Sequence, residues 1–185
     1  MDLVKEIVQL VGRSGTTRHV IGFVGLPYTG TAELANRLAN ALSKVSVESL
    51  TYDADNSYVQ MAPGIQMKSG NLGRDISEFK NGNPIYLSDS RVPDGVRVLI
   101  LTASLQFLPA DPDVCSGLDF LAFCTFEDGR QRLDRKIKAE TASGKTEDDI
   151  IGEFTLEQLR ERSASHLMRQ AQIIWCVDTQ TAKRA

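Results

Sequence analysis

The stretch His19-Val-Ile-Gly-Phe-Val-Gly-Leu-Pro-Tyr-Thr-Gly-Thr-Ala-Glu-Leu34 places a short apolar run, a loop bounded by glycines and the start of an amphipathic helix in direct succession. The run from Val20 to Val24 is rich in β-branched and aromatic residues, which is typical of a strand buried on both faces. After the loop, apolar residues recur at 34, 38, 41 and 42, the spacing of one helical face. The stretch therefore predicts the first half of a strand–helix–strand unit.

The loop has the spacing of a phosphate-binding P-loop, whose pattern is G-x-x-x-x-G-K-[ST]. Gly25 and Gly30 meet both glycine positions, but Thr31 and Ala32 stand where the lysine and the hydroxyl residue belong. In a working loop the lysine reaches the β- and γ-phosphates and the hydroxyl binds Mg²⁺. Glu33 adds a negative charge in the first helical turn, which repels a bound polyphosphate. Residues 25–32 are therefore predicted to form a degenerate P-loop.

Composition and charge exclude several classes of protein. With 185 residues, 42% hydrophobic and 24% charged, the chain is expected to form a single domain over residues 1–185. A net charge of −3 without a basic stripe argues against nucleic acid as a partner. The apolar runs are far shorter than the roughly 20 residues of a membrane helix, and the N-terminus lacks the blocks of a secretory signal. Three cysteines without metal-type spacing are expected as buried thiols, so we predict a cytoplasmic protein with no membrane contact and no metal site.

Strand-like and helix-like segments alternate along the rest of the chain. Strands are predicted at 20–24, 45–52, 97–101, 120–126 and 172–177. Helices are predicted at 2–12, after the loop with an apolar face over 34–42, at 128–141 and from 155 onward. The last helix is expected to open at a capping box, Thr155 to Gln158, and residues 60–84 to be irregular around one short helix at 74–79. This order predicts an α/β three-layer sandwich: a mainly parallel five-stranded sheet with helices on both faces.

The order of elements and two motifs resemble the P-loop small-molecule kinases of the uridine kinase, phosphoribulokinase and pantothenate kinase group. The loop Gly25-Leu-Pro-Tyr-Thr-Gly-Thr-Ala-Glu-Leu-Ala35 aligns without a gap with that group's G-x-x-G-S-G-K-S/T-T-L-A. Arg132-Leu-Asp-Arg-Lys136 is similar to its lid motif R-L-x-R-R. The chain departs from the group at Ile100-Leu-Thr-Ala103, where an acid and a glycine are usual. The resemblance implies the P-loop NTPase-like fold and, in active members, transfer of the ATP γ-phosphate to a hydroxyl.

The same resemblance implies the candidate site residues. The base of the group lies at the end of the second strand, and here either Asp53 or Asp55 is its counterpart. The phosphate site would comprise residues of the loop and of the lid-like basic helix 128–141: Gly25, Tyr28, Thr29, Gly30, Thr31, Arg132, Arg135 and Lys136. Plainer interpretations stand beside these: a solvated turn for the two aspartates, and pairing with nearby Glu and Asp for the basic residues.

Three functional hypotheses remain open from the sequence. The first is a catalytically inactive pseudokinase that binds a partner protein or a small ligand. The second is a binder of nucleotides or phosphometabolites that uses the amides of residues 26–32 and the basic lid face. The third is an active kinase for a small hydroxyl-bearing metabolite, which recruits a cation such as Lys68, Arg74 or Lys136. ATP and Mg²⁺ are expected only if the loop still binds phosphate, the partner is unknown, and a homo-oligomer is compatible with the sequence.

Overall fold

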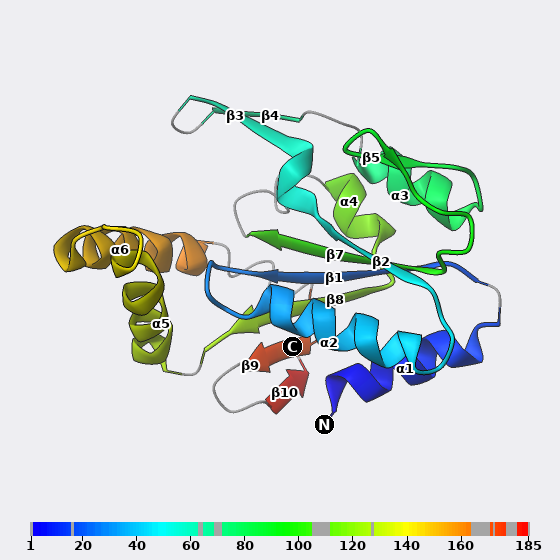
Figure 1. Cartoon of the computed structure of the whole chain (residues 1–185), viewed down its shortest axis with the longest axis horizontal. Helices are drawn as coiled ribbons and strands as arrows, with labels where there is room; N and C mark the ends of the chain where they lie inside the picture. Colours follow the sequence, from blue (N-terminus) through cyan, green and yellow to red (C-terminus); the bar gives the residue numbers. More distant parts are fainter. Residues whose placement is uncertain are drawn as a thin grey trace.

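Six strands form one sheet in the computed structural model of the chain, in the order β10-β9-β8-β1-β7-β2 (Figure 1). The structure describes residues 2–15, 17–62, 65–68, 72–104, 112–126, 128–163, 171, 173–176 and 181–184, and for 56–62, 65–68, 112, 160–163, 173 and 181–184 it describes the backbone only. The strands of this sheet are β1 (His19–Gly25), β2 (Ser49–Asp53), β7 (Val98–Ser104), β8 (Phe120–Thr125), β9 (Ile173–Cys176) and β10 (Thr181–Arg184). The helices are α1 (Leu3–Arg13), α2 (Thr31–Ser43), α3 (Leu72–Lys80), α4 (Pro112–Gly117), α5 (Gly129–Thr141) and α6 (Glu147–Ser163).

Five of the six strands are parallel, which confirms the predicted sheet. In register, β1 pairs with β7 on one side and β8 on the other, while β2 and β9 extend the sheet outward. Every residue of β1 is buried, as expected for the central strand of a sheet covered on both faces. The sixth strand, β10, pairs antiparallel with β9 and was not predicted. Its sequence, Thr-Ala-Lys-Arg, lacks the apolar signal of a strand. Edge strands often carry charged residues, because such residues discourage pairing of the open edge with another chain.

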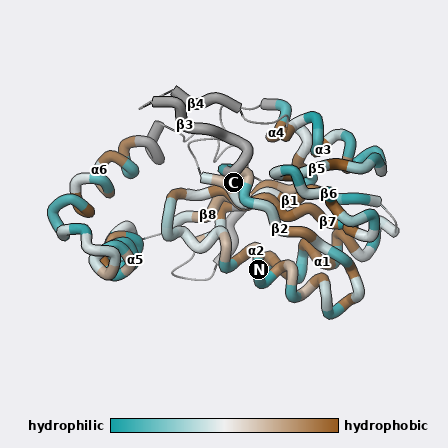
Figure 2. The backbone as a smooth tube through the Cα atoms, turned by 45° about the horizontal axis from the view of Figure 1, so that its top comes forward, coloured by the Kyte–Doolittle hydropathy of each residue, from teal (hydrophilic) through white to brown (hydrophobic). Residues whose placement is uncertain are grey.

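Helices cover both faces of this sheet (Figures 1 and 2). On one face the core is built by α1 and α2, through Leu3, Ile7, Val11, Leu34, Leu38 and Leu42. On the other face it is built by α3, α4 and the segments that follow α3, through Leu72, Ile76, Phe79, Ile85, Leu87 and Val114. The three-layer arrangement predicted from the sequence is therefore present.

The segment between β2 and β7 is more regular than predicted. A short 3₁₀ helix (Ala54–Ser57) leads into an antiparallel hairpin of β3 (Tyr58–Ala62) and β4 (Ile65–Lys68), and a second small hairpin joins β5 (Tyr86–Leu87) to β6 (Ser90–Arg91). The prediction of an irregular region over 60–84 was wrong for the end of β3 and for β4, while the short helix predicted at 74–79 is present within α3. Two-stranded hairpins need only local pairing across a turn, which composition rich in Gly, Asn and Pro does not exclude.

The two helices α5 and α6 form a hairpin that projects beyond the carboxyl ends of the parallel strands in both ribbon views (Figures 1 and 2). α6 begins at Glu147, not at the predicted capping box of Thr155. Thr155 Oγ donates to the Ile151 carbonyl at 3.0 Å, as a threonine inside a helix does. The N-cap lies earlier, at Thr146: the Asp149 amide donates to Thr146 Oγ1 at 3.3 Å, and the Thr146 hydroxyl donates to the Asp149 carboxylate at 2.6 Å.

The structure also describes the three cysteines and one of the two histidines, His19; because neither histidine has a metal-spaced partner in the sequence, both are predicted to be structural. Cys124 and Cys176 are buried, Cys115 is half-buried, and all three are free thiols. His19 is buried beside Ser14, with its Nε2 and Ser14 Oγ 2.5 Å apart, in keeping with a structural role. His166 lies outside the described residues. Within the parts of the chain that the structure describes, no helix combines the length and apolar composition needed to cross a membrane.

Candidate functional site

The candidate site lies where two neighbouring strands send the chain to opposite faces of the sheet. β1 continues into α2, whose buried residues pack on one face, and the chain after β7 leads to α4, whose Val114 packs on the other. In open α/β sheets, ligands bind outside the carboxyl ends of the strands at such a switch point. The predicted degenerate P-loop follows β1, while Asp53 ends β2 and Asp55 lies in the short helix after it, so both predicted groups follow the carboxyl ends of parallel strands.

The loop keeps the length of a P-loop and is held by contacts of its own. The amide and hydroxyl of Thr29 donate to the Leu26 carbonyl at 3.2 and 2.6 Å, which closes a tight turn with the Thr29 side chain buried. Gly30 then adopts a left-handed conformation (φ 73°) as the N-cap of α2, and the helix begins at Thr31. Glycine suits this position because it has no Cβ to clash. Gly25, Thr29, Gly30 and Thr31 therefore lie in one turn.

Gly25→Ala is expected to destabilise the protein by about 2 kcal/mol, because overpacking a rigid site costs about 1–3 kcal/mol. The added Cβ would lie 2.7 Å from the Cys124 carbonyl oxygen and press against Thr29 Oγ1, and the carbonyl belongs to a buried strand that cannot move aside. Urea unfolding measures the change. The control is Gly12→Ala in α1, where nothing lies within 4 Å and alanine should stabilise the helix by about 0.5–1 kcal/mol. Equal unfolding midpoints for the two variants would contradict this packing.

Tyr28 ties the loop to the α5–α6 hairpin. It adopts a positive φ of 68°, which is strained for a residue with a side chain. Its hydroxyl donates to Glu140 Oε1 at 2.9 Å, near the end of α5. Burial and this hydrogen bond raise the pKa of the Tyr28 phenol. Lys145 and Tyr28 together hold the pKa of Glu140 below its usual range, so the phenol stays a donor and the carboxylate an acceptor.

The first turn of α2 carries exposed side chains and one long ion pair. Ala32 and Glu33 are exposed and Thr31 is half-buried, and the N-terminus of the helix has no side-chain cap. Glu33 Oε1 and Arg135 Nη1 lie 3.9 Å apart, with both side chains largely exposed. Pairs of this kind stabilise little, but they place Arg135 beside the entrance of the loop. Arg135 also stacks over the Phe126 ring at 5.2 Å.

The two candidate bases at the end of β2 have different environments. Asp53 is exposed and accepts the amide of Asp55 at 3.1 Å. Asp55 is half-buried, and its two carboxylate oxygens accept the Ser104 amide at 3.0 and 3.1 Å, at the end of β7. Burial raises the pKa of the Asp55 carboxyl, the Ser104 amide opposes that rise and Asp53 adds to it. Asp55 is thus fastened to the neighbouring strand, while Asp53 faces solvent.

Arg132 and Lys136 are among the most buried polar residues described, with 3% and 2% of their surface exposed. Both pair with Glu157 of α6: Arg132 Nη1 lies 3.1 Å and Lys136 Nζ 2.6 Å from its carboxylate oxygens. Lys136 also lies 3.2 Å from Glu153 and 3.6 Å from Glu140. Burial disfavours the Lys136 ammonium, but its hydrogen bonds to Glu157 and Glu153 raise its pKa overall.

These contacts separate the three predicted lid cations. Only Arg135 reaches the start of α2, while Arg132 and Lys136 join α5 to α6. The i, i+4 spacing of Leu133 and Ile137 predicts that this pair is buried, and that prediction is wrong, since both are only half-buried. The sequence does carry a signal for the observed pairing: Glu153 and Glu157 are four residues apart, as are Arg132 and Lys136, so each pair shares a helical face.

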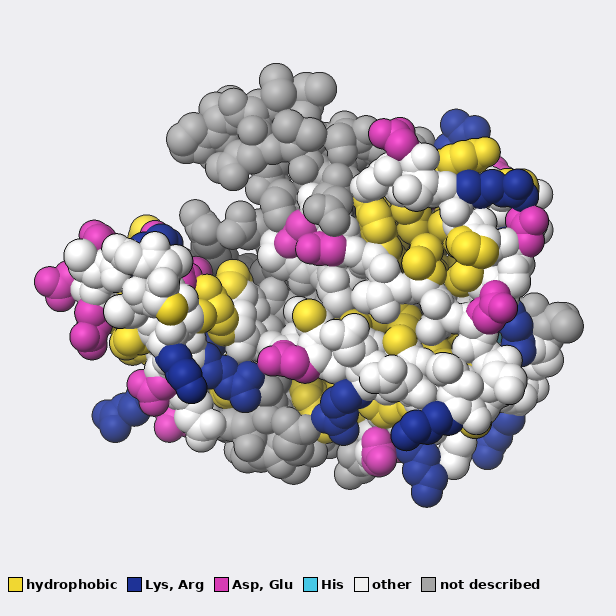
Figure 3. Space-filling view, viewed as in Figure 1, with side chains coloured by type: hydrophobic (Ala, Val, Ile, Leu, Met, Phe, Trp, Pro, Cys, Tyr) yellow, Lys and Arg dark blue, Asp and Glu magenta, His cyan; other side chains and the backbone are white. Residues whose placement is uncertain are grey.

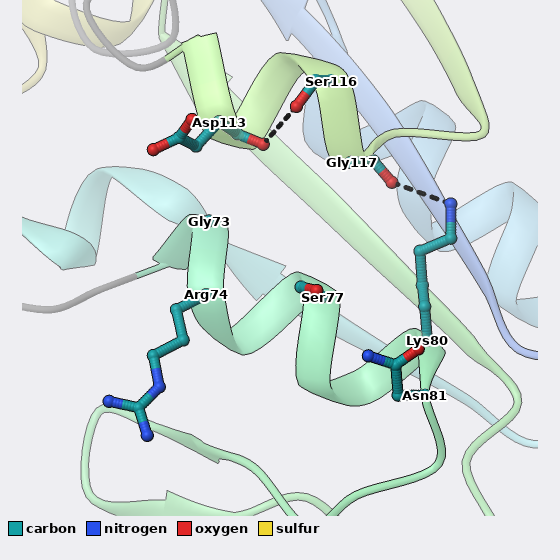
Figure 4. Close-up of a pocket in the computed structure, with 8 residues that line it drawn as sticks. All are labelled: Gly73, Arg74, Ser77, Lys80, Asn81, Asp113, Ser116 and Gly117. Carbon is teal, nitrogen blue, oxygen red and sulfur yellow. Dashed lines mark hydrogen bonds between the residues drawn. The ribbon is translucent and has the colours of Figure 1, made fainter.

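A separate polar groove of about 560 Å³ lies between α3 and α4 (Figure 4). It is lined by Gly73, Arg74, Ser77, Lys80, Asn81, Asp113, Ser116 and Gly117. The helices approach closely here, because a Cβ on Gly73 would lie 2.7 Å from Asp113 Cβ. Lys80 Nζ donates to the Gly117 carbonyl at 3.2 Å and to Asp119 at 2.6 Å. Of the residues considered for the site, only Arg74 lines this groove, and its walls are largely solvent-exposed.

The described residues were predicted to form no metal site. Among them, no group of three or more His, Cys, Asp or Glu residues could hold a metal ion. Lys68, considered as a recruited cation, lies where the structure describes the backbone only. The candidate groups at the carboxyl ends of the strands are therefore the loop after β1, Asp53, Asp55 and Arg135.

Comparison with known proteins identifies the fold. No protein-family model and no curated protein matches the sequence. Among solved structures, a proposed fructose transport system kinase from Silicibacter sp. TM1040 has a TM-score of 0.58 and 17% identity, over 80% of this chain and 86% of that one. A proposed uridine kinase from Bacillus stearothermophilus has a TM-score of 0.46 and 17% identity, over 80% of this chain and 92% of that one. The first likeness shows that the chain shares the α/β fold of that structure, in agreement with the predicted fold class.

Proposed function

We propose that residues 1–185 form one P-loop kinase-like domain that no longer transfers phosphate and acts by binding a protein or a small ligand. The observation that carries this proposal is the closure of the loop by protein groups. Tyr28 reaches across to Glu140 at 2.9 Å, and Glu33 and Arg135 face each other at the start of α2. The positions where a polyphosphate would lie in an active kinase are thus flanked by two carboxylates.

The residues present do not fit ATP with Mg²⁺. Thr31 supplies no cation and Ala32 no metal-binding hydroxyl. Arg132 pairs with Glu157, and Lys136 pairs with Glu157, Glu153 and Glu140. Arg135 lies 3.9 Å from Glu33. Because losing one electrostatic element of a transition-state site costs about 3–4 kcal/mol, losing the lysine and the hydroxyl together should all but abolish phosphoryl transfer.

A thermal-shift titration with ATP and Mg²⁺ tests this proposal. A ligand that binds the folded state raises the melting temperature by mass action, so no concentration-dependent shift is expected for the natural chain. Mg²⁺ alone and sodium sulfate serve as controls for ionic strength and for general anion binding at the N-terminus of α2. A shift that grows with ATP but not with sulfate would contradict the proposal, and without turnover it would favour the nucleotide-binder hypothesis.

The alternative is a kinase that transfers the ATP γ-phosphate to a hydroxyl of a nucleoside, sugar or pantothenate-like metabolite. The observation in its favour is the position of Asp53 and Asp55 at the carboxyl end of β2, where a base would face an acceptor hydroxyl. The similar structure from Silicibacter is described as a fructose transport system kinase. This alternative requires measurable turnover with a metabolite hydroxyl that disappears in Asp53→Asn or Asp55→Asn.

A further inference from the structure

Helix α6 carries apolar residues on two sides. Ile150 and Phe154, with 0% and 6% exposure, lie on the same side as Glu157, which pairs with α5. Ile151, Leu156 and Leu159 are 41%, 57% and 55% exposed, and we call these three residues the α6 stripe. At about 100° per residue they fall within a sector of about 140°, away from the side that packs on α5.

The α6 stripe lies on a part of the molecule that another chain can reach. Figures 1 and 2 place the α5–α6 hairpin beyond the carboxyl ends of the parallel strands. In Figure 3, hydrophobic side chains reach the surface of the hairpin among acidic ones. Scattered exposed leucines need no explanation, but three large apolar residues on one face of a projecting helix form a docking surface.

We propose that the α6 stripe binds the α6 stripe of a second copy of this chain, with the two helices antiparallel about a two-fold axis at Thr155. The argument is the symmetry of the sequence around that residue. Ile151 and Leu159 each lie four residues from Thr155, so Ile151 of one copy meets the partner's Leu159, and the reverse contact follows. An isologous interface requires this reciprocity.

Charge along α6 is self-complementary in the same register. Asp148 and Arg162 each lie seven residues from Thr155, and helical periodicity places both positions in the sector of the α6 stripe. An antiparallel pair therefore sets Asp148 opposite the partner's Arg162 twice. A parallel pair would instead set the acidic first turns, Glu147 to Asp149, against each other. Helix-dipole preference explains acids at the N-terminus by itself, but it does not explain the α6 stripe.

The size of the surface indicates weak association. A stable interface buries about 800 Å² on each partner, and three apolar side chains contribute less than that. We therefore expect a reversible dimer whose population rises with protein concentration. Sedimentation equilibrium of the full chain should show a mass that moves from one copy toward two as the concentration increases.

Leu159→Glu is expected to raise the dissociation constant of the dimer at least about tenfold, because it places a charge against the partner's Ile151 twice. The matched control is Leu10→Glu on α1, where the leucine is 43% exposed, and the dimer should be unchanged. Both sites are exposed, and circular dichroism verifies that both variants fold. The proposal would be overturned if the natural chain stays monomeric at all concentrations, or if Leu159→Glu leaves the dissociation constant of the dimer unchanged.

Charge reversal tests the register. Asp148→Arg and Arg162→Asp should each weaken self-association, since each variant then meets like charges across the axis. Mixed together, the two variants should form a heterodimer, because the arginines of one face the aspartates of the other. Failure of the mixture to associate more tightly than either variant alone would rule out the antiparallel register about Thr155.

Discussion

Lys136→Met should destabilise the α5–α6 hairpin by about 3 kcal/mol. Methionine keeps the length of the side chain but removes the ammonium that lies 2.6 Å from Glu157 and 3.2 Å from Glu153. Breaking a buried ion pair from one side leaves the other charge uncompensated, which typically costs about 3–5 kcal/mol. The lower end of this energy range applies to Lys136→Met because Arg132 still contacts Glu157 at 3.1 Å. Hydrogen exchange of the amides in α5 and α6 measures the free energy of local opening.

Lys145→Met is the matched control for this prediction. Lys145 Nζ lies 2.9 Å from Glu140 and 2.9 Å from Glu153, so it shares carboxylate partners with Lys136. Its side chain is 44% exposed, however, and an exposed pair exchanges its contacts for water at little cost. Protection of the hairpin amides should therefore stay nearly unchanged. Similar loss of protection in the two variants would mean that burial of Lys136 is not what stabilises the hairpin.

The sheet could be predicted from the sequence because its signals are local. The apolar run of β1, the two glycines of the loop and the periodicity of α2 follow one another in the chain, and hydrophobic patterning determines which residues face the core. The antiparallel strand β10 could not be predicted in this way. A polar edge strand forms because a neighbour offers free backbone groups, which is a property of the folded sheet and not of Thr181 to Arg184 alone.

The sequence predicts positions for the candidate site but not the contacts that its residues make. The loop and the end of β2 were expected at one crevice, since parallel strands end at the same edge. The link from Tyr28 to Glu140 spans 112 residues, and the burial of Arg132 and Lys136 depends on α6 folding back along α5. Single-sequence periodicity does not show which helix packs on which, so basic residues that join two helices look the same as residues that face a ligand.

Restoring the loop chemistry should create nucleotide binding. The variant carries Thr31→Lys, Ala32→Ser and Glu33→Thr, which returns the cation, returns the hydroxyl and removes the repelling carboxylate. A charge-assisted hydrogen bond contributes about 1.5–3 kcal/mol, so the dissociation constant for ATP with Mg²⁺ should fall about 10- to 100-fold below that of the natural chain. Isothermal titration calorimetry measures the change. The control replaces Thr31 by Met and keeps the other two changes, and it should gain little.

Tyr28 determines how much of that gain is realised. Its side chain extends from the loop to Glu140, and its φ of 68° is a conformation that glycine adopts without strain. Adding Tyr28→Gly to the restored loop removes the side chain that closes the loop and leaves the backbone path available. The variant with all four substitutions should therefore bind ATP more tightly than the variant with three. If the natural chain binds ATP as tightly as both variants, the loop is open to ATP, and the nucleotide-binder hypothesis would replace the proposal; the kinase interpretation would in addition require turnover.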